Sequence, residues 1–237
     1  MPQPPHATSF RLAVVPGVTV GKWARMWAER LPGIELEVLA VEAAQAAARV
    51  ADDAAAGLLR LPVNPTVFHA IPLYTETTVV AVPRDHLLTA AAEVTLADLA
   101  GEALLQPADD VLAWPTPQPA TEPGRAEPAG PSAGVAPPST AVAVEMVAAG
   151  AGVLVMPQSL ARLHHRRDLA YRPVIDGPTS SVGLVWRRDG HTDLVEQMIG
   201  IVRGRTVNST RGTTPAATKD RTAATRQRRT PPRRRGR

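Results

Sequence analysis

The clearest pattern of apolar positions lies near the start of the chain. Residues 12–15 form a continuous apolar run, which is typical of a β-strand buried on both faces. Pro16 and Gly17 end that run. The apolar residues that follow recur at helical spacing: Val20, Trp23, Trp27 and Leu31. The pattern therefore predicts a strand that turns directly into an amphipathic helix, with the two tryptophans as core residues.

The turn formed by Gly17, Val18 and Thr19 is a candidate binding site. The first backbone N–H groups of a helix have no partner inside the helix, and the helix dipole adds partial positive charge there. A carboxylate or phosphate beside this turn would meet both. The alternative is an ordinary connection between a strand and a helix, with a solvated turn that binds nothing.

The next segments repeat the alternation of strand and helix. Residues 34–38 alternate apolar and acidic side chains, as a strand does. Residues 42–56 are rich in alanine and end at Gly57, which suits a helix and its C-terminal cap. Residues 58–62 then predict a third strand. Such an opening implies parallel strands, with any ligand at their carboxyl ends.

The middle of the chain predicts further strands and then a long loop. Residues 71–74 and 77–82 are apolar or β-branched, and a short helix is expected to start at Thr95, with a strand at Leu104-Leu105. Residues 106–138 contain nine prolines and three glycines. Because proline lacks the N–H donor that helices and central strands need, we expect a loop that is partly extended or disordered.

Regular patterning returns after the proline-rich loop. Ser139 and Thr140 can cap a helix, because their hydroxyl oxygens accept bonds from free N–H groups. The remaining predicted elements are a strand at 153–157, a helix from Ser159, strands at 169–175 and 181–186, and a last helix after Thr192.

Composition narrows the classes of protein. A chain of 237 residues allows one large domain or two small ones. Cysteine is absent, which excludes disulfides, thiolate zinc sites and thiol catalysis. The first residues lack the pattern of a signal peptide, and no apolar run approaches the roughly 20 residues that span a bilayer. We therefore expect a cytoplasmic protein without a membrane partner.

Charge is distributed unevenly along the chain. Residues 206–237 carry ten Lys or Arg and one acid, whereas residues 1–205 carry 16 bases and 21 acids. The tail also lacks apolar periodicity, so we expect it to be disordered. Five of its arginines are candidates for contacts with nucleic-acid phosphates: Arg228, Arg229, Arg233, Arg234 and Arg235. The alternative is a tail that only aids solubility.

No motif for enzyme chemistry is present. The phosphate-binding loop, the dinucleotide fingerprint and the GxSxG elbow are all missing. His164 and His165 are adjacent, and neighbouring side chains on a helix point about 100° apart, which is poor geometry for sharing a metal. His86 next to Asp85 lacks a nucleophile nearby. We therefore expect no catalytic residues, no metal and no cofactor.

Several segments, in their order and spacing, resemble the effector-binding domain of LysR-type transcriptional regulators. That domain is similar in fold to the type 2 periplasmic binding proteins. The segments that carry the resemblance are residues 71–74, 79–88, 94–100, 145–157 and 183–188. The resemblance covers about residues 9–205 and implies an α/β fold of two lobes with a ligand cleft between them.

The resemblance also implies a division of the chain. Lobe I comprises residues 9–83 and 168–205, and lobe II comprises residues 84–167, with the proline-rich loop 106–138 as part of lobe II. Residues 206–237 form the tail.

The resemblance implies that a small, anionic effector lies between two helix N-termini. One is the turn at Gly17, Val18 and Thr19, and the other is at Ser139 and Thr140. Arg60 is the cation expected to pair with a carboxylate, and Pro62 is assigned to the same site. The alternative for Arg60 is a salt bridge to Asp52 or Asp53, or a solvated strand end.

Two hypotheses about function follow. Only nine residues precede Phe10, where the first stretch of strand and helix starts, so the winged helix-turn-helix of family regulators is not expected in this chain. The first hypothesis is a stand-alone effector-binding domain with a regulatory role in transcription. Relatives of this domain pair side by side, which implies a homodimer. The alternative is a nucleic-acid-associated interaction protein that acts through its basic tail, with a vestigial cleft.

Overall fold

A computed structural model describes residues 9–114 and 136–204. These residues form an α/β structure with two sheets, one of five strands and one of four. Two segments of interest lie outside the described residues: the basic tail with its arginines, and residues 115–135 of the proline-rich loop. Among the described residues, no helix has the length and apolar character needed to cross a membrane.

The five-stranded sheet contains the predicted parallel opening. Its strands, in spatial order, are β2 (Glu35–Ala40), β1 (Ser9–Val14), β3 (Ala56–Leu61), β9 (Ser180–Arg187) and β4 (Phe68–Glu76). β1 is parallel to both β2 and β3, while β9 is antiparallel to β3 and β4. The prediction of a parallel start with helical crossovers is therefore confirmed.

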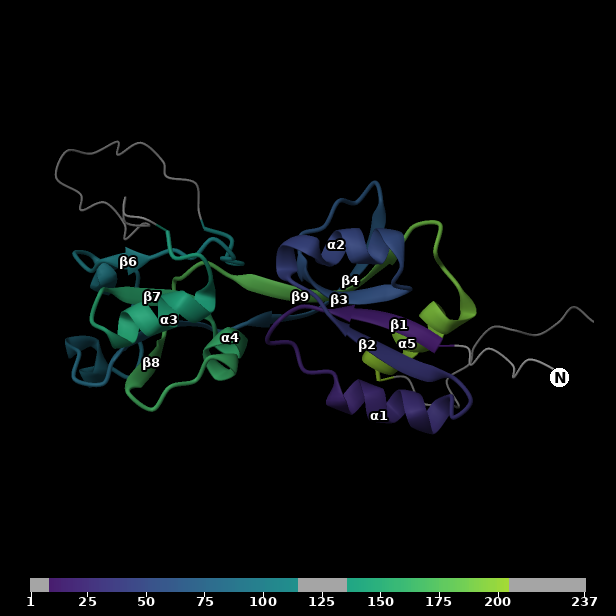
Figure 1. The fold of residues 1–237 in the computed structure, drawn as a ribbon, viewed down its shortest axis with the longest axis horizontal. Coiled ribbons are helices and arrows are strands. Elements are labelled where there is room, and N and C mark those ends of the chain that lie inside the picture. Colours follow the sequence, from purple (N-terminus) through teal and green to yellow (C-terminus); the bar gives the residue numbers. More distant parts are fainter. Residues whose placement is uncertain (1–8, 115–135, 205–237) are drawn as a thin grey trace, which may run out of the picture. The chain divides into compact units, whose positions relative to one another are not determined.

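Helices cover both faces of this sheet (Figure 1). α1 (Gly21–Arg30) and α5 (Asp193–Val202) lie on one face, and α2 (Ala43–Asp52) lies on the other. Trp27 of α1 is 1% exposed, packs on Phe10 and donates from Nε1 to the Ile34 carbonyl at 2.9 Å. Trp23 packs against the same cluster while partly exposed. Trp27 is thus a core residue, and Trp23 packs against the core on the same side of the helix, which agrees with their spacing.

The four-stranded sheet has the spatial order β6 (Leu104–Leu105), β7 (Val153–Pro157), β5 (Thr78–Pro83) and β8 (Leu169–Pro173). Val79 and Ala81 of β5 pack against α3 (Thr140–Ala148) and α4 (Gln158–Leu163). Val80 and Val82 face the other way, onto Leu99 and its neighbours. Because β5 is buried on both faces, its residues show no polar alternation.

Sheet membership moves the expected lobe boundaries. β5 and β8 fell in lobe I by the expected division at 83/84 and 167/168, but both are strands of the four-stranded sheet. The chain therefore passes between the sheets at Thr77 and again between Val174 and Ser180. An apolar run such as β5 suits the centre of either sheet, so its sequence does not say to which sheet it belongs.

The first part of the proline-rich loop, which we expected to be partly extended or disordered, is an ordered loop in the structure. Asp110 accepts hydrogen bonds from Trp114 Nε1 at 2.7 Å, from the Leu112 amide at 2.9 Å and from Gln106 Nε2 at 3.2 Å. Leu112 is buried against the four-stranded sheet. Two features hold residues 106–114 in place despite the prolines that follow. One is the Asp110 carboxylate, which accepts several hydrogen bonds, and the other is the buried side chain of Leu112.

Gly152 lies just before β7 and close to Ala103, which precedes β6, so a substitution at Gly152 tests this contact between the two strand starts. Its φ is +156°, and a Cβ there would lie 2.2 Å from the Ala103 carbonyl oxygen, which accepts a bond from the Val153 amide. We expect Gly152→Ala to lower the free energy of unfolding by about 2–4 kcal/mol, because overpacking against backbone adds to conformational strain. Urea unfolding would measure this.

The matched control is Gly101→Ala. Gly101 also has a positive φ, of +92°, but a Cβ there would meet nothing within 4 Å. Its cost should be limited to strain, about 1 kcal/mol. Equal costs for the two substitutions would contradict the proposed clash with Ala103.

Candidate functional site

A pocket of about 600 Å³ lies at the carboxyl end of β1. We call it the crossover pocket, because one wall is the segment where β4 leads into β5. Its other walls are the turn between β1 and α1 and the helix α4. The lining residues are Gly17, Val18, Thr19, Tyr74, Thr75, Glu76, Thr77, Gln158, Ser159, Arg162 and Leu163. The pocket therefore draws on both sheets and on the chain that joins them.

The first wall contains the predicted turn. Gly17 has φ +84°, and a Cβ at this position would lie 2.5 Å from Ser159 Oγ, so only glycine lets the turn approach α4 this closely. α1 begins at Gly21 behind Val20, with no side-chain cap and no acidic residue in its first turn. The structure thus places an uncapped helix start next to a turn that lines a pocket.

The second wall supplies a cationic side chain. Arg162 of α4 is exposed and donates from Nη2 to Gln158 Oε1 at 3.1 Å, which is a neutral acceptor. Arg162 forms no ion pair with a carboxylate of residues 9–114 or 136–204. Its positive charge is therefore available to an anion in the pocket.

The third wall is mainly hydroxyl-bearing. Tyr74, Thr75 and Thr77 contribute it. Burial raises the pKa of the Tyr74 phenol, and the nearby charge of Arg60 opposes this shift only in part. The phenol therefore stays protonated at neutral pH and can donate a hydrogen bond. A ligand in the crossover pocket would meet mostly hydrogen-bonding groups.

Arg60 lies behind the pocket lining and is already engaged. Its side chain is 9% exposed and forms an ion pair with Glu76, whose side chain is 6% exposed. The partner is therefore neither a ligand carboxylate nor Asp52 or Asp53, and the buried side chain does not form a solvated end, as the sequence also allowed. Asp53 pairs with Arg11 instead. Burial lowers the pKa of Arg60. A guanidinium nevertheless stays protonated at neutral pH, and Glu76 balances its charge.

The other expected helix N-terminus is capped from within the chain. The Thr140 amide and hydroxyl both donate to Asp109 Oδ1, at 2.6 and 2.9 Å, and Ser139 Oγ accepts from the Val142 amide at 3.3 Å. Thr140 is 3% exposed. An internal carboxylate thus occupies the place that we expected an effector anion to take. Neither Ser139 nor Thr140 lines the crossover pocket, and neither does Pro62.

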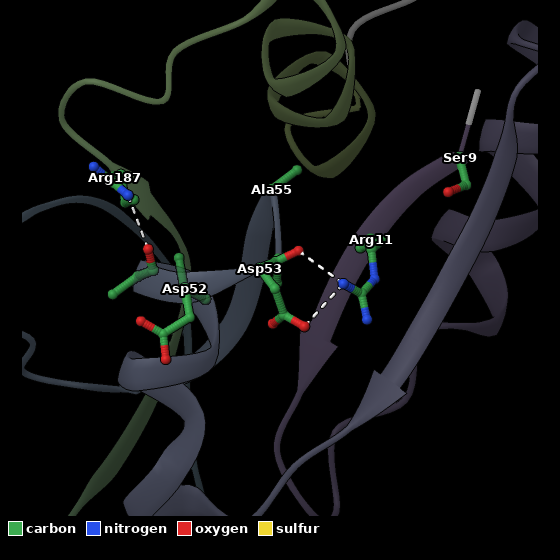
Figure 2. A pocket seen from close by; sticks show the side chains of 9 residues that line it. Ser9, Arg11, Asp52, Asp53, Ala55 and Arg187 are labelled. Carbon is green, nitrogen blue, oxygen red and sulfur yellow. Dashed lines mark hydrogen bonds and ion pairs between the residues drawn. The ribbon is translucent and has the colours of Figure 1, made fainter. Parts of the chain in front are cut away.

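A second pocket, of about 330 Å³, lies at the amino ends of the parallel strands (Figure 2). Three of its four charged side chains, those of Arg11, Asp53 and Arg187, already have partners. Arg11 Nη1 donates to Asp53 Oδ2 at 2.8 Å, and Arg187 Nη1 donates to the Ala51 carbonyl at 2.9 Å. Ligands of open α/β sheets bind at the carboxyl ends of the strands. The crossover pocket is therefore the better candidate site.

No group of three or more metal-ligating side chains comes together in the described part of the chain. His86, which the sequence raised as a candidate base, instead accepts the Leu88 amide on Nδ1 at 3.3 Å and caps a short 3₁₀ turn.

Comparison with known proteins agrees with this architecture. The family model described as the LysR substrate binding domain matches residues 5–206. The crystal structure of the oxidised form of OxyR is 25% identical, with a TM-score of 0.65, and covers 84% of this chain and 96% of its own. The BenM effector-binding domain with its effector benzoate is 18% identical, with a TM-score of 0.64, over 88% and 99% of the two chains. A search of curated proteins gave no match.

These findings define a ligand-binding regulatory domain with the type 2 periplasmic-binding-protein fold. The chain belongs to the LysR substrate-binding domain family. The resemblance noted in the sequence is therefore confirmed over almost the same residues. At 18% identity, BenM shares the fold alone.

Two walls of the crossover pocket, those from α4 and from residues 74–77, were not predicted from the sequence. A signal for α4 was available. Met156-Pro157-Gln158-Ser159 repeats the arrangement at Val15-Pro16-Gly17-Val18, in which a buried strand ends at a proline and leads into a helix. No pattern in the sequence marks residues 74–77, because they line the pocket only through the way β4 leads into β5.

The ion pair of Arg60 with Glu76 yields a stability prediction. Glu76→Gln leaves a buried guanidinium without a counter-charge, so we expect a loss of about 3–5 kcal/mol in the free energy of unfolding. Chemical denaturation of the full chain would measure it. As a control, Asp189→Asn removes a carboxylate from the exposed pair with Arg187 and should leave stability nearly unchanged. If the two substitutions lower the free energy of unfolding by similar amounts, burial does not make the Arg60–Glu76 pair more important for stability than an exposed pair.

Proposed function

We propose that this chain binds a small anionic metabolite in the crossover pocket and thereby serves in the regulation of transcription. The observation that carries the proposal is a pocket of about 600 Å³ whose walls come from both sheets and from the joining segment. That volume lies within the range of small-molecule sites, roughly 300–1,000 Å³. A ligand that contacts all three walls would bind most tightly to the arrangement of lobes in which the walls are closest. Ligand binding would therefore favour that arrangement of the lobes.

The charges around the crossover pocket favour an anion. Arg162 offers an unpaired cation, whereas the negative charge of Glu76 is balanced by Arg60. The start of α1 adds N–H groups without a side-chain cap next to Thr19. The lining carries several hydroxyl groups but only two aliphatic side chains, Val18 and Leu163. We therefore propose a small, polar carboxylate or phosphate rather than a large apolar ligand.

Relatives support the class of ligand. The BenM structure contains benzoate, named as its effector, and benzoate is a carboxylate. Regulation of transcription takes place where the DNA is, so a cytoplasmic location and a non-enzymatic role go with this proposal. Relatives in this family act as oligomers, and a homodimer is the assembly we propose here.

Arg162 gives a direct test of the anion site. Isothermal titration of the full chain with a panel of small carboxylates should identify at least one that binds, and Arg162→Gln should weaken that ligand about five- to tenfold, as loss of a partly exposed charge-assisted bond would. Arg167→Gln is the matched control, because Arg167 is also exposed but does not line the pocket. Binding that falls equally in both variants, or no binding by any carboxylate, would contradict the proposal.

A second candidate function rests on the charge of the tail. Residues 206–237 carry ten Lys or Arg against one acid, enough to neutralise several phosphates. We propose that this segment gives sequence-independent binding to nucleic acid. It lacks aromatic residues, so base stacking would not contribute.

The salt dependence of DNA binding tests the tail. Replacing Arg228, Arg229, Arg233, Arg234 and Arg235 by glutamine in the full chain should weaken binding to duplex DNA. It should also lower the slope of log K against log salt by up to about 4.5, since each phosphate contact contributes about 0.9. Fluorescence anisotropy across a salt series would measure both. An unchanged slope would exclude these arginines as phosphate contacts.

A further inference from the structure

We propose that Arg60 is a positioning residue of the crossover pocket, which holds the α4 wall against the turn wall through a hydrogen bond to Ser159. The inference rests on the proposed function, because the walls that Arg60 positions are those of the proposed ligand pocket. The hydrogen bonds of Arg60 themselves involve no ligand. Arg60 thus takes a role different from the carboxylate contact expected from the sequence.

The guanidinium of Arg60 joins four separate segments. Nη2 donates to the Pro16 carbonyl at 3.2 Å and to Ser159 Oγ at 3.2 Å, and Nη1 donates to Ser180 Oγ at 3.1 Å. Glu76 completes the set with an ion pair. Pro16 precedes the turn, Glu76 ends β4, Ser180 begins β9 and Ser159 belongs to α4. Arg60 itself is in β3, so one side chain reaches both crossings between the sheets.

Ser159 is the acceptor that connects the two lobes. Pro16, Glu76 and Ser180 belong to the five-stranded sheet or its connections, whereas Ser159 is in a helix that packs on the four-stranded sheet. The contact is reinforced next to it, because Gly17 approaches Ser159 so closely that a Cβ would lie 2.5 Å from its hydroxyl oxygen. The turn and α4 therefore meet at Ser159, at the inner edge of the pocket.

Arg60 is suited to positioning rather than to ligand contact. Arg60 does not line the crossover pocket, whereas two of its partners, Glu76 and Ser159, do. The Glu76 carboxylate would repel an anion that approached Arg60 from the pocket. A guanidinium can hold several acceptors at once because its donors form a rigid fork. Arg60 thus fixes the separation of two walls without contributing a charge to the ligand.

The distance between the lobes, measured without ligand, tests this role. The chain has no cysteine, so Ala48→Cys on α2 and Ala141→Cys on α3, both exposed, allow a pair of spin labels on the full chain. In double electron–electron resonance, Ser159→Ala should broaden the distance distribution and add longer distances, because α4 loses its bond to Arg60. Arg60→Lys, which keeps a charge for Glu76 but has no fork, should have the same effect.

Ser181→Ala is the matched control. Its hydroxyl lies 2.8 Å from Thr75 Oγ1, and both residues belong to the five-stranded sheet, so its loss removes a similar bond without touching the lobe contact. The control should keep the wild-type distribution. A Ser159→Ala distribution identical to that of wild type, or an equal broadening in Ser181→Ala, would overturn the proposal.

Adding the tightest-binding carboxylate from the panel separates this inference from the proposed function. We expect Ser159→Ala to weaken that ligand about threefold to tenfold and the ligand to narrow the broadened distribution. If no carboxylate binds while Ser159→Ala still broadens the distribution, the positioning role stands and the proposed function fails. If carboxylates bind while the distribution stays unchanged in Ser159→Ala, the positioning role fails.

Discussion

The buried ion pair between Arg60 and Glu76 is the interaction on which the candidate site depends. Two opposite charges, 9% and 6% exposed, lie where β3, the end of β4 and the start of β9 meet. Charges are expensive to remove from water, so hydrogen bonds to the remaining donors and acceptors of such a pair help to stabilise it. Here Nη1 and Nη2 of Arg60 donate to the turn, to β9 and to α4, whereas its buried Nε has no hydrogen-bond partner in the described part of the chain. The ion pair and these bonds hold the ends of several segments together at one point.

This arrangement has a consequence for the charge of the crossover pocket. Because Glu76 neutralises Arg60, the pocket keeps the exposed Arg162 as its cation and hydroxyl groups over much of its lining. A site with one exposed cation and an uncapped helix start suits a small singly charged acid better than a large apolar one. At the other end of the five-stranded sheet, Arg11 pairs with Asp53 and Arg187 pairs with Asp189, so the cations that line that pocket are already engaged.

The α3 N-terminus shows how a chain can satisfy its own anion site. Asp109 holds the Thr140 amide and hydroxyl, and Ser139 caps the same helix, so the free N–H groups that attract an anion are already used. The α1 N-terminus has no such partner from a side chain. Two helix starts that look alike in sequence therefore differ in what they offer to a ligand, because a loop residue 31 positions away reaches only one of them.

The sequence by itself determined the elements and the family. Apolar runs such as 12–15 and 153–157 become buried strands, the spacing of Trp23 and Trp27 marks the inner face of α1, and the LysR-like segments match the family model over residues 5–206. These features depend on local periodicity, which neighbouring residues encode. The turn at Gly17, Val18 and Thr19, which lines the crossover pocket, was also predicted in this way, because a strand that turns into a helix is a local pattern.

Only the tertiary structure decided which partners the polar residues take. Glu76 is 16 positions from Arg60, Ser159 is 99 positions away and Ser180 is 120, so no spacing in the chain reveals that they meet. The membership of β5 and β8 in the second sheet was hidden for a similar reason, since a strand buried on both faces has no polar side to show its neighbours. The role of Arg60 changed from expected ligand contact to internal cross-link, because charge pairing depends on distance in space rather than on distance along the chain.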